Sequence, residues 1–75
     1  MTGTERLADR HAAYRAINRM RVARQAAHLA LYAAGCKAAA VTPADVQDQA
    51  RRLSGLDDGP LSTAEARDAL AYYTA

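Results

Sequence analysis

Small apolar residues recur along the first half of the chain with the period of an α-helix. They are spaced alternately three and four positions apart, which is the heptad spacing of a helix that packs on another helix. No glycine or proline interrupts residues 12–34, so the pattern predicts one long helix over residues 2–34. This seam of small residues consists of Ala13, Ala16, Met20, Ala23, Ala27, Ala30 and Ala34.

Helix-capping signals mark the ends of this helix and predict two more. Thr2 with Glu5 is spaced as an N-terminal capping box, and Gly35 suits the left-handed turn after a helix. Thr42 followed by proline opens a helix over residues 43–54, and Ser62 opens one over residues 62–74. Strand patterns are absent, so the sequence predicts an all-α, three-helix protein of the helical-bundle type with a single domain over residues 1–75.

The first helix has two apolar sides, whereas each short helix has only one. Bulky residues gather roughly opposite the seam, and we expect the short helices to pack on that bulky side. The seam is then left for a second copy of the chain, in an isologous homodimer. Asn18 is the weakest point of the long helix, where a kink is expected first. The bulky residues are Leu7, Tyr14, Val22, Leu29 and Tyr32.

Composition also favours a partner subunit. Only 17 of the 38 hydrophobic residues are larger than alanine or cysteine, and phenylalanine and tryptophan are absent. A chain of this size with so thin a core usually needs a disulfide, a metal or a partner. The single Cys36 cannot form an intramolecular disulfide, and the two histidines have no metal-ligand spacing. We therefore predict no metal and no cofactor.

The charges divide the chain into a basic first half and an acidic second half. Residues 1–36 hold six arginines against two acidic residues, and residues 37–75 hold four basic residues against six acidic ones. On a helical projection, one flank of the long helix carries a row of basic side chains. This basic flank consists of Arg6, Arg10, Arg21, Arg24 and His28.

The basic flank predicts a non-catalytic interaction or regulatory protein that docks its long helix on a protein partner. A phosphate backbone also suits such a flank, so a nucleic-acid-binding protein is the alternative. The net charge of only +2 and the Glu65 and Asp68 of the third helix favour the protein partner, because they leave little positive field for DNA. A small anionic ligand, or an enzyme, in an arginine-lined cavity is a further alternative. The flanking arginines could instead pair with the acidic second half.

No motif in the sequence predicts catalysis. Glycine-rich phosphate loops, nucleophile elbows and paired metal ligands are all missing, so we predict that the protein is not an enzyme. At the end of the third helix, Tyr73 continues the apolar face, and Tyr72 is expected to be exposed. The N-terminal residues are charged and no apolar stretch is long enough for a bilayer, so we expect a cytoplasmic protein without membrane contact.

Overall fold

The fold is all helical, as the sequence pattern predicts. A computed structural model describes residues 3–53, 55–56 and 59–74, with side chains described from residue 10 onward. Strands are absent from these ranges, and each helix boundary lies within two residues of its prediction. The predicted capping box of Thr2 with Glu5 lies outside the described residues. The elements are α1 (Gly3–Ala33), the short 3-10 helix η1 (Ala38–Ala40), α2 (Pro43–Arg52) and α3 (Thr63–Thr74).

The long helix α1 runs without a break through Asn18 and ends in a left-handed turn. Gly35 and Cys36 have φ angles of +65° and +64°. The Cys36 N–H donates to the Leu31 carbonyl at 2.8 Å, and the Gly35 N–H donates to the Tyr32 carbonyl at 3.1 Å. These are the two hydrogen bonds of a Schellman motif. The motif closes α1 at the predicted glycine.

Both short helices begin with a complete capping box. In α2, the Thr42 N–H donates to Asp45 Oδ2 at 2.9 Å, and the Asp45 N–H donates to Thr42 Oγ1 at 3.3 Å. In α3, the Ser62 N–H donates to Glu65 Oε1 at 3.0 Å, and the Glu65 N–H donates to Ser62 Oγ at 3.1 Å. Each box satisfies N–H groups that have no partner within the helix. The predicted start of each short helix is therefore confirmed.

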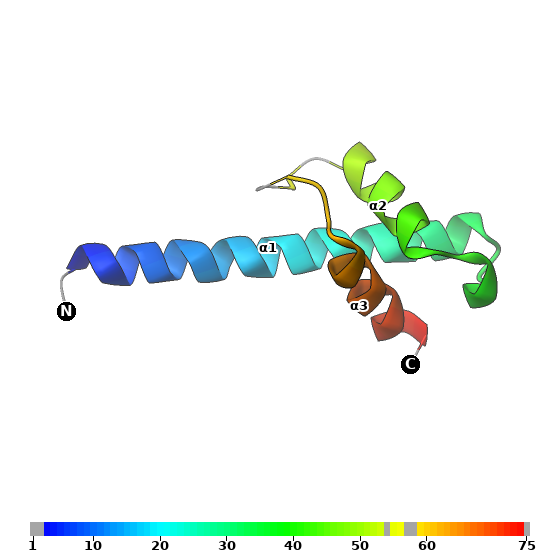
Figure 1. The fold of residues 1–75 in the computed structure, drawn as a ribbon, viewed down its shortest axis with the longest axis horizontal. Coiled ribbons are helices and arrows are strands. Elements are labelled where there is room, and N and C mark those ends of the chain that lie inside the picture. The colour runs from blue at the N-terminus through cyan, green and yellow to red at the C-terminus, as the bar shows by residue number, and fades with distance from the viewer. Residues whose placement is uncertain (1–2, 54, 57–58, 75) are drawn as a thin grey trace.

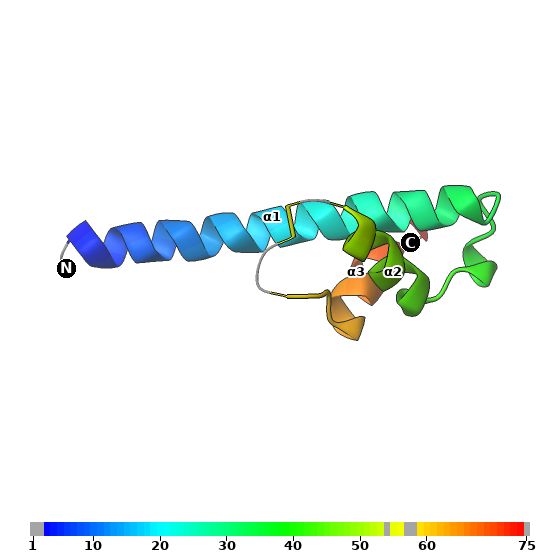
Figure 2. The ribbon, with the colours of Figure 1, turned by 90° about the horizontal axis from the view of Figure 1, so that it is seen from above.

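The two short helices lie on the same side of α1, against its C-terminal half. Figure 1 shows α2 and α3 diverging from each other, and Figure 2 shows that both form a second layer on one side of α1. Every pair of the three helices is in contact. The N-terminal half of α1 extends away from this layer (Figures 1 and 2).

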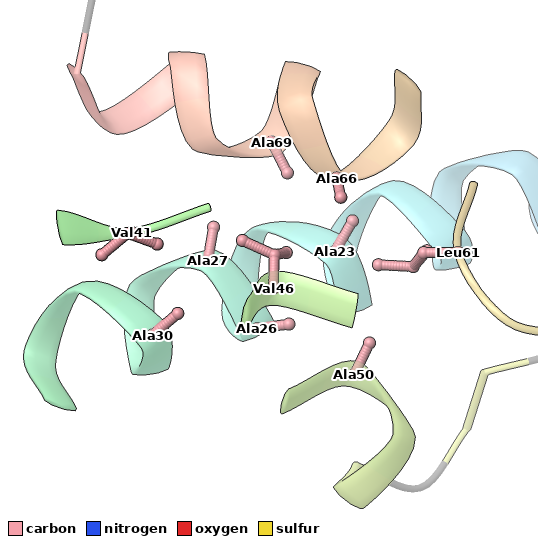
Figure 3. Close-up of a cluster of buried hydrophobic side chains, with 10 residues drawn as sticks. All are labelled: Ala23, Ala26, Ala27, Ala30, Val41, Val46, Ala50, Leu61, Ala66 and Ala69. Carbon is pink, nitrogen blue, oxygen red and sulfur yellow. The ribbon is translucent and has the colours of Figure 1, made fainter. Parts of the chain in front are cut away.

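The core forms where these three helices meet, and the residues that α1 contributes to its buried cluster are alanines (Figure 3). Leu31 packs against the cluster from α1. The larger side chains come from the other elements: Val46 from α2, and Val41 and Leu61 from the segments that precede α2 and α3. Small residues on one helix let the neighbouring axes approach closely, so larger side chains opposite fill the space. The buried cluster consists of Ala23, Ala26, Ala27, Ala30, Val41, Val46, Ala50, Leu61, Ala66 and Ala69.

The prediction that the short helices pack on the bulky side of α1 is wrong. Tyr14 and Tyr32 are 70% and 76% exposed, whereas Val22 is buried and Leu29 is half-buried. The side chain of Leu7 lies outside the described residues. The physical reason is that a tyrosine at the contact would hold the helices apart and bury a hydroxyl that needs a partner. Alanines impose neither cost, so the short helices pack on them.

The molecule is elongated because α1 is much longer than the core it supports. Its principal dimensions are 50 × 24 × 16 Å, and 31 helical residues at 1.5 Å each span about 46 Å. The radius of gyration is 14.3 Å, against about 11 Å for a compact chain of this length. We call residues 10–17, which are all exposed, the projecting half of α1.

Candidate docking surface of α1

One side of α1 lies outside the buried core and is exposed along its whole described length, although its C-terminal part meets the end of α3. Its residues are spaced three or four positions apart, so they form one stripe on the helix. Basic and large apolar or aromatic side chains alternate along it. We call this stripe the outer face. It consists of Arg10, Tyr14, Ile17, Arg21, Gln25, His28 and Tyr32, all of which are exposed.

The charge on α1 is of one sign over most of the helix. Residues 10–33 contain five arginines and two histidines and no acidic residue. The acidic residues of the described second half lie on α2 and α3. The outer face thus presents positive charge together with apolar surface, a combination that suits an anionic partner with an apolar component.

The predicted dimer seam is divided between the core and the solvent. Its C-terminal part packs against the short helices of the same chain, because α2 and α3 lie on that side. A second chain therefore has access only to the N-terminal part in this structure. Buried members are Ala23, Ala27 and Ala30, Ala34 is half-buried, and Ala13, Ala16 and Met20 are exposed.

Arg19 connects α1 to the start of α3. Its Nε donates to Glu65 Oε2 at 3.0 Å, and its Nη2 donates to Glu65 Oε1 at 2.8 Å. The same guanidinium donates to the carbonyls of Gly59 and Pro60 at 2.9 and 3.1 Å. The neighbouring Asn18 side chain donates to the Gly55 carbonyl. These contacts fix the connector before α3 against α1.

The pairing of Arg19 changes the acidity of its partner. Hydrogen bonding from Arg19, and then from the Ser62 backbone, lowers the pKa of Glu65 from 4.5 to about 2. The Arg19 side chain is only 14% exposed, so this guanidinium is part of the folded framework. Arg19, which lies outside the predicted basic flank, thus pairs with an acidic residue of the second half.

A second group of contacts joins α1 to the end of α3. The Arg24 guanidinium carbon lies 4.0 Å from the centre of the Tyr72 ring, a cation–π contact. The Tyr72 and Tyr73 rings meet edge to face with centroids 5.1 Å apart. The Tyr73 ring in turn lies 5.8 Å from that of His28. Four side chains from two helices thus form one continuous cluster.

Two open hollows flank this cluster and share two of its rings. The residues that line both are His28 and Tyr73. The basic hollow is lined by Arg21, Arg24, Gln25, His28 and Tyr73. The apolar hollow is lined by His28, Leu31, Tyr32, Cys36, Ala38, Tyr73 and Thr74.

The structure brings together three of the five residues predicted for the basic flank. Arg21, Arg24 and His28 line the basic hollow, with Arg24 half-buried and the other two exposed. Arg10 is exposed but lies 11 residues before Arg21, about 16 Å along the helix. The side chain of Arg6 lies outside the described residues.

Sequence reasoning missed the part played by Arg19 and by the terminal tyrosines. Nothing in the composition separates Arg19 from the other arginines, although Glu65 of a capping box was a visible acidic partner. Tyr73 was expected to continue the apolar face of α3 and is 42% exposed, and Tyr72 is 59% exposed. Two adjacent tyrosines in a chain with four in all were the available signal.

Other chemistry is sparse in the part of the chain that the structure describes. Cys36 is an exposed free thiol. No group of three or more histidine, cysteine or acidic side chains is placed to hold a metal ion among these residues. Within the same ranges, α1 is too polar, and the other helices too short, to cross a membrane.

Comparisons with protein families, with curated proteins and with solved structures found no significant match.

Proposed function

We propose that the protein is a non-catalytic interaction protein that docks the projecting half of α1 on a protein partner. The observation that carries this proposal is the apolar surface left exposed there. Tyr14 and Ile17 are 70% and 52% exposed, and they lie three residues apart, about one helical turn. Large apolar side chains at this spacing are the anchors of a helix that lies in a groove of another protein.

Charge narrows the chemistry of that partner. The exposed apolar side chains are accompanied by Arg10 and Arg21 on the outer face, and residues 10–33 contain no acidic residue. A groove with apolar pockets and an acidic rim would match both features. A second α1 carries the same positive charges, so we favour a different, acidic protein as the occupant.

A homodimer is a separate proposal, now confined to the exposed part of the seam. Ala13 and Ala16 are small enough for close contact with another helix, and Met20 lies one turn further on. The charges of two α1 helices oppose such a pairing, whereas the acidic residues of α2 and α3 would favour contact with a neighbouring α1. The oligomeric state of the purified chain tests this proposal independently of the acidic partner.

The docking proposal is tested by placing a photo-reactive amino acid on the projecting half. The analogue replaces Tyr14 or Ile17 in separate variants, and Ala44, which is exposed on α2, serves as the matched control position. After irradiation in the source cell, we expect the same acidic protein to be captured from positions 14 and 17 and not from position 44. Nucleic acid captured from positions 14 and 17 would contradict a protein partner.

Affinity measurements with the purified partner complete the test. Tyr14→Ala and Ile17→Ala should each weaken binding about tenfold, because anchor residues of this kind carry most of the binding energy. Ala44→Ser should leave the affinity unchanged. Binding that is insensitive to Tyr14→Ala and Ile17→Ala would show that the projecting half is not the docking surface.

A further inference from the structure

The basic hollow between α1 and the end of α3 contains donors and no acceptor of full negative charge. Two guanidinium groups, an imidazole, an amide and a phenol line it. Two carboxylates, those of Glu65 and Asp68, lie with Arg24 in a separate groove between α1 and α3. Glu65 is paired with Arg19. The hollow is therefore suited to an anion.

The two arginines of the basic hollow place like charges close together on α1. Arg21 and Arg24 lie three residues apart on one flank of the helix. Like charges at helical spacing destabilise a helix. In the described chain, neither Arg21 nor Arg24 has an ion-pair partner. A bound anion would remove this repulsion.

The Arg24 side chain is already held in place for such a role. Its guanidinium lies over the Tyr72 ring at 4.0 Å, and Arg24 is half-buried. Stacking uses the flat face of the guanidinium and leaves the N–H groups on its edge free for an oxygen ligand. Less side-chain entropy is lost on binding when the cation is positioned in advance.

The neighbouring apolar hollow indicates that the anionic ligand also carries an apolar group. It shares His28 and Tyr73 with the basic hollow and adds Leu31 and Tyr32. Tyr32 is 76% exposed and Tyr73 is 42% exposed, so each has ring surface available for stacking. An anion and a flat ring held side by side are the chemistry of a nucleotide.

We propose that these two hollows form a nucleotide-binding site. Arg21 and Arg24 bind the phosphate in the basic hollow, and Gln25 donates to it or to the sugar. The base packs in the apolar hollow against Tyr32 and Tyr73. The ligand is a free mononucleotide or one unpaired unit of single-stranded DNA or RNA, because a base inside a duplex cannot reach the rings. This site is on the C-terminal half of α1 and is separate from the projecting half.

NMR titration of the isotope-labelled full chain tests the site, with uridine monophosphate, uridine, inorganic phosphate and an oligothymidylate as probes at low salt. Uridine monophosphate or the oligothymidylate should shift the amide signals of residues 21–28 and 70–74. Uridine without its phosphate should bind several-fold more weakly. If the oligothymidylate binds more strongly than uridine monophosphate, and if Arg10→Gln weakens its binding, the ligand is a strand. Binding of the mononucleotide unaffected by Arg10→Gln would identify the free nucleotide.

Substitutions separate the phosphate contact from the stacking contact. Arg21→Gln should weaken nucleotide binding about threefold, because it removes one exposed charge-assisted contact. Tyr73→Leu should weaken binding of the nucleotide and leave binding of inorganic phosphate unchanged. Arg67→Gln, at an exposed arginine on α3, is the matched control. Arg21 is exposed, so Arg21→Gln should remain folded, as circular dichroism will verify.

Two results would overturn the site. One is the absence of any shift with about 10 mM mononucleotide, an affinity too weak to be specific, together with no response to the oligothymidylate. The other is an equal loss of affinity in Arg21→Gln and Arg67→Gln, which would show non-specific attraction to positive charge. Neither result bears on docking by the projecting half, because that surface is tested by Tyr14 and Ile17.

Discussion

Replacing Arg19 with methionine should destabilise the fold by about 2 kcal/mol, because two charge-assisted hydrogen bonds to a partly exposed carboxylate are lost. The methionine keeps much of the apolar stem of the side chain and removes the guanidinium. Its loss breaks the two bonds to Glu65 and the two to the carbonyls of Gly59 and Pro60. The start of α3 then loses its polar connection to α1.

The magnitude follows from the acidity of Glu65. A fall in pKa from 4.5 to about 2 would correspond to roughly 3 kcal/mol of unfolding free energy if the whole shift contributed to stability. Part of this shift comes from Ser62 and the Glu65 side chain is 37% exposed, so the share of Arg19 after solvent screening is about 1–2 kcal/mol. The carbonyl contacts of Arg19 add a smaller amount, because those groups are exposed and can bond to water.

The same pair predicts how stability depends on pH. The folded-state pKa of Glu65 lies below its unfolded value, so the stabilisation is fully present above about pH 5. It is lost as the pH falls from about 5 to about 2, when the carboxylate is protonated in the folded state as well. In Arg19→Met this acid dependence should become weaker, and the part that comes from the Ser62 hydrogen bonds should remain.

Urea unfolding followed by circular dichroism, at several pH values in this range, measures both effects. Glu65→Gln and the double variant complete a mutant cycle, and glutamine can still form the capping box with Ser62. Arg51→Met is the matched control, because Arg51 pairs with Asp48 at 3.5 Å on an exposed surface and should matter little. An Arg19→Met protein as stable as the wild type, or with the same acid dependence, would refute the reasoning.

Three further predictions concern the faces and the end of α1. Ala27→Leu should cost about 1–3 kcal/mol in urea unfolding, because position 27 is fully buried and an added side chain overpacks the core; Ala13→Leu, at an exposed position, should not. Cys36→Gly should stabilise the fold by about 0.5–1 kcal/mol by relieving a left-handed backbone, and a lower urea midpoint would contradict this. Ala16→Glu should convert the proposed homodimer to a monomer in light scattering, and a monomeric wild-type protein would refute the dimer itself.

The helices could be predicted from sequence because their signals are local. Thr42 with Asp45, Ser62 with Glu65, and Gly35 after the last helical turn each act over a few residues. A short-range hydrogen bond does not depend on what the rest of the chain does. The boundaries therefore follow from the sequence to within two residues.

The packing side of α1 could not be predicted in the same way, because both sides of the helix are apolar. The choice depends on residues outside α1. Val46 and Leu61 are the large side chains that meet it, and they fit against alanine better than against tyrosine. Periodicity along one helix contains no information about the size of the side chains that will face it.

The candidate site can likewise be predicted from the sequence only in part. The helical period places Arg21, Arg24 and His28 on one flank of α1, and the three residues line the basic hollow. Their association with Tyr72 and Tyr73 depends on where α3 crosses α1, which the period of neither helix specifies. Arg19 differs from its neighbours only through its three-dimensional position beside Glu65.

The two halves of α1 are expected to differ in local stability, because only the C-terminal half is covered by α2 and α3. Amides near Ala26 and Ala27, under α2 and α3, can exchange with solvent only when the core opens. Those of residues 10–17 need a smaller opening to exchange, because all of these residues are exposed and lie outside the buried cluster. A partner that binds this half must also hold it helical, and that cost depends on intrinsic helix propensity. Ala12→Gly, at an exposed position, would then weaken binding without removing a large anchor side chain.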